Sequence, residues 1–277
     1  MSSFLNKKRL FISEILIFLL IQILGLLTGW QMWISPEWRE AFKFSPYTLG
    51  EFLIGFAAAL LFVLIFLKIF QKRDFPFRLL FYFLVFLTGS IVFLVWLPEV
   101  LAIGLVIILF LILHFRPNIL VQNLAVSLMC IGAAAFLGLG FEPKQLIIIL
   151  IILAVYDIVA VFVSGHMIKM FKEMVGHKLV LALTIPTTLK GWLTNISQVK
   201  VGQDFMFLGT GDLVLPLALA ISSLRHGLIS SVFVILGSGI GMAILVWYFL
   251  SQKEKRALPA LPPIIVGSIL GYLISFL

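Results

Sequence analysis

The sequence is an almost unbroken series of apolar runs separated by short polar connections. A helix that crosses a bilayer needs about 20 apolar residues, because each residue adds about 1.5 Å along the helix axis. By this criterion the pattern predicts nine spanning helices, and the run 79–114 is divided in two at Pro98 and Glu99. The predicted fold class is an all-α membrane protein with nine transmembrane helices, at about 11–33, 48–67, 79–97, 99–114, 118–141, 145–168, 205–224, 228–250 and 258–277.

The distribution of basic residues predicts how the chain is oriented. Sixteen of the 20 Lys and Arg residues lie on segments that share a side with the N-terminus, and the four others are Arg39, Lys43, Lys144 and Arg225. Cytoplasmic connections carry the excess of Lys and Arg in membrane proteins. We therefore expect a cytoplasmic N-terminus and an external C-terminus.

The longest polar connection divides the predicted helices into two groups. Residues 1–168 form a six-helix N-terminal part, 169–204 a cytoplasmic loop, and 205–277 a three-helix C-terminal part. No linker or repeat separates them further, so we expect one domain overall.

Composition supports a multi-pass integral membrane protein, which we expect in the cell membrane. The chain has 277 residues, of which 62% are hydrophobic and 12% are charged, and these values exclude a soluble globular protein. The net charge of +8 follows from the basic loops, and no basic stripe with interleaved aromatic residues is present. The expected partner is therefore the lipid bilayer and not a nucleic acid.

Two aspartates lie inside predicted spanning helices. Asp157 is in the sixth and Asp212 in the seventh, and a carboxylate at that depth costs on the order of 3 kcal/mol. Asp157 lies 12 residues before Lys169 and Asp212 lies eight residues after Asp204. These separations correspond to depths of ~18 and ~12 Å from the cytoplasmic side. Consecutive antiparallel helices therefore bring the two carboxyl groups to a similar level, and we expect them to meet.

The residues around Asp212 favour a close approach to it. Gly209 and Gly211 flank Thr210, and glycines allow a neighbouring backbone or a substrate to come near. Pro216 has no amide hydrogen for the carbonyl of Asp212, four residues earlier, so we expect a kink there.

Two chemistries fit a buried pair of carboxyl groups. Such a pair holds one proton between them and titrates as a unit. One carboxylate then activates water, and the other acid protonates the carbonyl oxygen and later the leaving amine, which is aspartyl-protease chemistry. The alternative is a proton- or cation-coupled transporter or channel that uses the aspartates as a relay.

A third feature lies at the start of the last predicted helix. Pro259, Pro262 and Pro263 remove three amide donors within five residues and disfavour a helix before each ring. We expect an extended stretch here and a helix only from about 264. Non-helical backbone at membrane depth survives only beside protein or a wet cavity. Such a stretch can pair with an unwound substrate by backbone hydrogen bonds.

Together these motifs resemble the presenilin and signal peptide peptidase family of intramembrane aspartyl proteases. The resemblance is carried by Tyr156-Asp157, by the Gly-x-Gly-Asp motif at 209–212 and by Pro-Ala-Leu at 259–261, in this order on the sixth, seventh and ninth helices. It implies a presenilin-like bundle that cleaves peptide bonds within transmembrane helices of membrane-protein substrates. It also implies that Asp157 and Asp212 are catalytic. The substrate-binding residues that it implies are Tyr156, Gly209, Thr210, Gly211, Pro259, Ala260 and Leu261.

The resemblance has limits that refine the expectation. Thr210 stands where a leucine is common in eukaryotic members, which can alter the preferred cleavage site. The loop of about 36 residues is short compared with that of presenilins that cut themselves, so we do not expect self-cleavage. The cytoplasmic N-terminus is similar to that of the presenilin branch. The compact length is similar to that of microbial, archaeal relatives, and implies activity without accessory subunits.

The remaining polar and small residues receive structural interpretations. No cofactor and no metal are expected, because the four histidines form no cluster with each other or with Cys130. Glu14 and Glu51 lie near helix ends, where solvation accounts for them. The pairs Gly25/Gly29, Gly237/Gly241 and Gly267/Gly271 predict close helix packing within the bundle, with dimerisation as the alternative.

Overall fold

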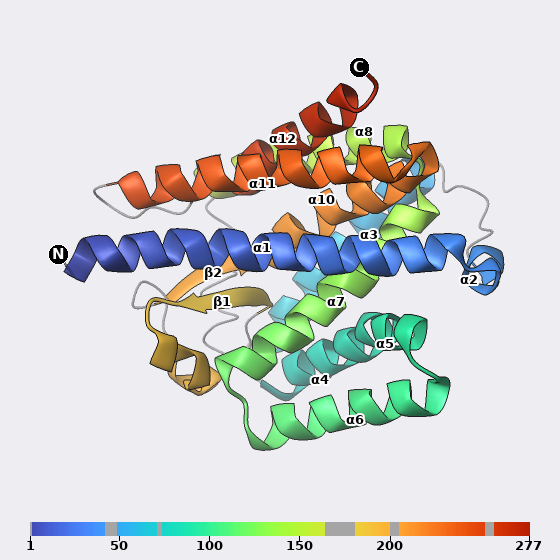
Figure 1. The fold of residues 1–277 in the computed structure, drawn as a ribbon. Helices are drawn as coiled ribbons and strands as arrows, with labels where there is room; N and C mark the ends of the chain where they lie inside the picture. The colour runs from blue at the N-terminus through green and yellow to red at the C-terminus, as the bar shows by residue number, and fades with distance from the viewer. Residues whose placement is uncertain (1, 42–48, 71–73, 164–180, 200–204, 253–257) are drawn as a thin grey trace.

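Helices make up most of the protein. The structure is a computed structural model that describes residues 2–41, 49–70, 74–163, 181–199, 205–252 and 258–277 (Figure 1). The helices of the N-terminal part are α1 (Ser2–Ile34), α2 (Pro36–Ala41), α3 (Leu49–Phe70), α4 (Asp74–Leu84), α5 (Ser90–Trp96), α6 (Glu99–Phe115), α7 (Ile119–Gly140) and α8 (Pro143–Ile158). Turns of π-helix join α4 to α5 at Val85–Gly89 and extend α8 at Val159–Val163.

The C-terminal part begins with a β-hairpin and continues with three helices. Strands β1 (Ala182–Pro186) and β2 (Phe205–Gly209) pair antiparallel, with Thr184 opposite Phe207. Short 3₁₀ turns lie at Leu189–Leu193, Ile196–Gln198 and Ser223–His226. The helices are α10 (Thr210–Ser222), α11 (Leu228–Ser251) and α12 (Leu261–Ile274).

The apolar helices identify a multi-pass integral membrane protein. Among the described residues, five helical segments are long and apolar enough to cross a membrane, at 9–34, 75–96, 119–140, 143–162 and 228–251. Two shorter apolar helices, Glu99–Phe115 and Leu261–Ile274, accompany them. The count of nine crossings and the cytoplasmic N-terminus remain predictions.

The structure corrects two of the predicted boundaries. Residues 205–209 were expected to open a helix, but they form β2, because Ala182–Pro186 pairs with them. The fold is therefore not purely α-helical, and the predicted loop 169–204 contains β1. The last helix begins at Leu261 and not near 264, because Pro262 and Pro263 occupy its first turn, where no intrahelical amide donor is needed.

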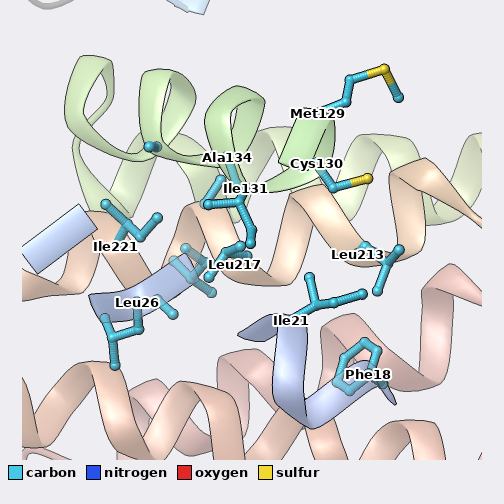
Figure 2. Packing of buried hydrophobic residues seen from close by; sticks show 14 of the residues in the cluster. Phe18, Ile21, Leu26, Met129, Cys130, Ile131, Ala134, Leu213, Leu217 and Ile221 are labelled. Carbon is cyan, nitrogen blue, oxygen red and sulfur yellow. The ribbon is translucent and has the colours of Figure 1, made fainter. Parts of the chain in front are cut away.

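Helix α10 lies in the middle of the bundle, between α1 and α7. Leu213, Leu217 and Ile221 of α10 are fully buried, and Figure 2 shows them between side chains of these two neighbours. A Cβ atom at Gly25 of α1 would lie 2.3 Å from Leu217, and one at Gly138 of α7 would lie 2.7 Å from the carbonyl oxygen of Ala218. The absence of side chains at these positions therefore sets how closely α10 is enclosed.

Helices α11 and α12 pack through glycines on both sides. A Cβ at Gly237 would lie 2.0 Å from the carbonyl oxygen of Gly267, and one at Gly241 would lie 2.2 Å from that of Pro263. Gly271 makes an equally close approach to Phe233. This confirms the prediction of close packing for the last two glycine pairs, whose faces are already occupied within the chain and do not provide a dimer surface.

Candidate active site

Asp157 is buried near the end of α8, with one backbone donor directed at it. Its side chain is 6% exposed, and the amide of Leu261 donates to its Oδ2 at 3.1 Å. The π-helical turn Val159–Val163 follows immediately, and such turns often occur at functional sites. The Pro-Ala-Leu stretch therefore supplies a hydrogen bond to the first aspartate.

Asp212 lies in the first turn of α10, three residues after the N-cap Gly209. Its carboxylate accepts a hydrogen bond from the amide of Gly209, as the third residue does in a capping box. A Cβ at Gly209 would lie only 2.9 Å from Oδ2 of Asp212. The glycine is therefore required for the carboxylate to fold back on the helix start. The positive end of the helix dipole favours a negative charge at this position.

The fold brings the two aspartates together. Helix α8 packs against α10 and α12, and the charge of Asp157 acts on that of Asp212. As whole residues, Asp157 is buried and Asp212 is half-buried. The helices that carry the two aspartates are therefore neighbours in the bundle, and the direct meeting of the two carboxyl groups remains a prediction.

A side chain of α7 hydrogen-bonds the β-hairpin to the bundle. Asn123 of α7 donates from Nδ2 to the carbonyl of Thr184 at 2.8 Å, and its Oδ1 accepts from the amide of Thr184 at 2.9 Å. Both backbone groups that Thr184 turns away from β2 are thereby satisfied. Since β2 runs directly into Thr210, this contact also fixes the approach to Asp212.

The other predicted site residues take different positions. Thr210 is partly buried, Gly211 is exposed, and a Cβ at Gly211 would meet nothing within 4 Å. Gly211 therefore leaves open space beside Asp212. The ring of Tyr156 is 42% exposed and lies outside the buried pair, because adjacent helical residues point about 100° apart.

The Pro-Ala-Leu residues lie at the entry to α12. Pro259 and Ala260 are partly buried in the irregular stretch before the helix, and Leu261 is its first residue and is buried. Of the three, Leu261 contacts Asp157 by the hydrogen bond described above. The substrate-binding roles of all seven residues remain predictions.

Sequence reasoning did not predict that three buried polar or thiol groups lie near Asp212. Glu14 was expected at a solvated helix end, but it is 4% exposed, its Oε2 has no hydrogen-bond partner in the described part of the chain, and it lies close enough to Asp212 to interact electrostatically. Gln22 of α1 is fully buried, and Cys130 of α7 lies 4.0 Å from the carbonyl oxygen of Thr210. Glu14 falls on the same helical stripe as the buried Leu10, Phe18 and Ile21, which is the signal that identifies it as inward-facing.

The described residues hold no group of three His, Cys, Asp or Glu side chains placed to bind a metal ion. His166 and His177 lie outside the described residues. Each aspartate has a backbone amide donor, and a pair of carboxyl groups is able to carry out general acid–base chemistry with water.

The fold and the paired carboxyl groups define a polytopic membrane protein of the intramembrane aspartyl protease class. The profile described as "Signal-peptide peptidase, presenilin aspartyl protease" matches residues 15–277, so the chain belongs to this family. The resemblance to this family is thereby confirmed.

Solved structures support the same fold. A presenilin family intramembrane aspartate protease in a C222 crystal aligns with a TM-score of 0.67 and 21% identity over 96% of this chain and 98% of that one. A structure of a presenilin family intramembrane aspartate protease in a P2 crystal gives a TM-score of 0.65 and 22% identity over 95% of this chain and 96% of that one. No curated protein sequence matches the chain. None of these comparisons supports the transporter alternative.

Proposed function

We propose that the chain hydrolyses peptide bonds within transmembrane helices, with Asp157 and Asp212 as the catalytic pair of a Gly-x-Gly-Asp protease. The observation that supports the proposal is the packing of α8 against α10, which brings Asp157 and Asp212 close enough to interact electrostatically. The chain belongs to an aspartyl protease family, in which paired aspartates are expected to hydrolyse peptide bonds. A structural role would not require two acids at this depth.

The chemistry follows from one proton shared between two carboxyl groups. The ionised carboxyl group takes a proton from a water molecule, and the oxygen of that water attacks the scissile carbonyl carbon. At the same time the protonated carboxyl group gives its proton to the carbonyl oxygen of the substrate. Collapse of the tetrahedral intermediate breaks the C–N bond, and the amine leaves with a proton from the pair. Because only the singly protonated pair is active, activity should fall on both sides of a pH optimum.

The hairpin supports a mode of substrate binding. A peptide bond must be extended before water can attack it, and an extended segment binds readily to the edge of a sheet. Asn123 already occupies the outer edge of β1 at Thr184, so we assign the substrate strand to β2. From there the segment reaches Thr210 and the open space at Gly211. Tyr156, Gly209, Pro259, Ala260 and Leu261 complete the proposed substrate contacts.

The proposal extends to the assembly and orientation of the enzyme. The nine-helix topology with a cytoplasmic N-terminus places the pair toward the cytoplasmic side, as the basic residues predict. The segments 1–168, 169–204 and 205–277 then form one catalytic unit that acts without accessory subunits.

The test uses the full chain purified in detergent with a single-helix transmembrane peptide. We expect cleavage by the wild type and loss of more than about a thousandfold for Asp157→Asn and for Asp212→Asn, because each removes half of one acid–base unit. A hydroxyl-containing isostere of the tetrahedral intermediate should inhibit, since it mimics the transition state.

Thr28→Val provides a control for handling and folding, because Thr28 lies on α1 and its hydroxyl donates to Leu24 of the same helix at 2.9 Å. Cleavage that persists in both asparagine variants would refute the proposal. If the asparagine variants instead abolished ion flux in liposomes and no peptide cleavage were found, the relay alternative would replace it.

A further inference from the structure

Helix α1 carries a buried amide that reaches the helix bearing Asp212. Gln22 is fully buried, and its Nε2 donates to the carbonyl oxygen of Leu213 at 3.0 Å. Leu213 directly follows Asp212, and it is fully buried against Ile21 and Phe18 of α1 (Figure 2). One side chain of α1 therefore holds the first turn of α10 from outside.

That turn has fewer internal restraints than an ordinary helical turn. Pro216 cannot donate to the carbonyl of Asp212, which would be its partner in a regular helix. The glycines at 209 and 211 leave the backbone before Asp212 with more conformational freedom than any other residue would. The bond from Gln22 thus acts where the helix itself restrains Asp212 least.

The side-chain carbonyl oxygen of Gln22 indicates that this residue does not serve stability alone. Its Oε1 is buried and has no hydrogen-bond partner among the residues that the structure describes, and such an oxygen destabilises a folded protein. Methionine has nearly the same volume and would fill the same space without that cost. An apolar residue would therefore serve packing at least as well, and the N–H donor is the part of Gln22 that the site uses.

We propose that Gln22 is a positioning residue for proteolysis, which holds the Leu213 carbonyl so that the carboxyl group of Asp212 meets Asp157. This inference rests on the proposed function. Gln22 itself does not contact the reacting atoms. Its contribution should appear in the rate of the chemical step and not in substrate affinity.

The experiment compares Gln22→Met with the wild type and with Thr28→Val, a control at a buried polar position on the same helix. For each we measure kcat and KM on the transmembrane peptide, and Tm in the same detergent. We expect kcat of Gln22→Met to fall about tenfold, as for one lost hydrogen bond at a positioned group, with KM within about twofold. Its Tm should equal or exceed that of the wild type, and Thr28→Val should keep the wild-type kcat.

Hydrogen exchange gives a second readout that does not depend on turnover. Peptides covering 205–215 should exchange faster in Gln22→Met than in Thr28→Val, because the turn has lost its external restraint. If Gln22→Met folds poorly, Gln22→Leu provides the same comparison.

An unchanged kcat, a change in KM alone, or a loss of activity that only follows the folded fraction would each overturn the role of Gln22. The asparagine variants separate this result from the larger proposal. If wild-type cleavage depends on the two aspartates and Gln22→Met is fully active, only the positioning role fails. If the wild type does not cleave, both proposals fall together.

Discussion

The two ends of α10 differ in how many of the nearby buried polar groups have hydrogen-bond partners. At the end away from Asp212, Ser222 donates to the carbonyl of Phe141 at 2.6 Å. Beside it, Arg225 donates to the carbonyls of Gly138, at 2.9 Å, and Leu139. Among the described residues, three buried side-chain oxygens without a hydrogen-bond partner lie at the end with Asp212, on Glu14, Gln22 and Thr184, and one, on Ser231 of α11, lies near the other end.

This difference separates stability from function along one helix. Satisfied buried hydrogen bonds stabilise a fold, and unsatisfied ones are tolerated where a site needs polar groups ready for a reaction. The outer end, with Arg225, therefore anchors α10 to α7. At the end with Asp212, the buried oxygens without partners lower the stability of the fold. Asp212, the Gln22 amide and the open space at Gly211 lie at this end.

The largest combined loss of stability and activity is expected from substitutions of the glycines between α11 and α12. Two of these glycines allow a matched test of whether stability and function depend on different parts of the bundle. A Cβ at Gly241 would lie 2.2 Å from the backbone of Pro263, and one at Gly271 would lie 2.1 Å from that of Phe233. Gly241→Ala and Gly271→Ala should each lose about 2 kcal/mol of unfolding free energy, because rigid backbones must move apart. Gly241→Ala should also lower kcat about a hundredfold, because the displaced α12 start carries the Leu261 amide away from Asp157.

Unfolding in denaturant and peptide cleavage, measured on the same samples, check this pair. Gly271→Ala, at the far end of the same contact, is expected to keep kcat within a few-fold once corrected for folded protein. Equal losses of kcat in both variants would show that the contact acts as one rigid unit, and the separation along the bundle would not hold.

The next largest effect is expected to be a loss of unfolding free energy with no change in kcat. Arg225→Met removes a charged donor from two carbonyl groups at the end of α7 and should cost about 3 kcal/mol. Burial lowers the pKa of Arg225 and the charge of Glu142 opposes this shift, but the guanidinium stays charged. The kcat of folded Arg225→Met should equal that of the wild type. Arg116→Met, at an exposed arginine, should change the unfolding free energy by less than about 0.5 kcal/mol.

Chemical denaturation followed by tryptophan fluorescence measures both arginine variants. A drop in kcat of folded Arg225→Met would mean that the outer end transmits its order to Asp212, and the two ends would not be independent.

The sequence predicted the features that the lipid imposes. Long apolar runs gave α7 and α11 within a few residues and the end but not the start of α1, and Asp157 and Asp212 stood out because charge is rare at such depth. Their common depth followed from the rise per residue and predicted that they meet. These inferences depend on local composition and on helix geometry alone.

The features that the sequence did not predict depend on partners far along the chain. Strand β2 has the composition of the helix that follows it, and only its pairing with β1 about 20 residues earlier determines its conformation. Gln22 is 191 residues from its acceptor. A polar residue within a spanning helix gives no sign of which neighbour it meets, so the contribution of α1 to the site appeared only in the structure.

A smaller effect is expected where the hairpin meets α7. Asn123→Leu leaves the amide and carbonyl of Thr184 without their partners and should cost about 2 kcal/mol. The loosened hairpin should also lower kcat/KM about tenfold through a weaker substrate platform. Asn118→Ala, which removes the N-cap of the same helix, should cost about 1 kcal/mol with kcat/KM unchanged. Faster amide exchange in 182–186 for Asn123→Leu would confirm the mechanism, and wild-type exchange would contradict it.

The smallest effect tests how much of the surroundings of Asp212 the site needs. Cys130 is fully buried, and its Sγ lies 4.0 Å from the carbonyl of Thr210, which is the outer limit of a weak hydrogen bond. Cys130→Ala should therefore cost about 1 kcal/mol through a small cavity and change kcat by less than about twofold. Thiol-modifying reagents should leave the native wild type active, because the thiol is inaccessible. A tenfold loss of kcat in Cys130→Ala at unchanged Tm would instead show that the thiol positions Thr210. Helix α7 would then contribute a positioning residue to the site, as α1 does.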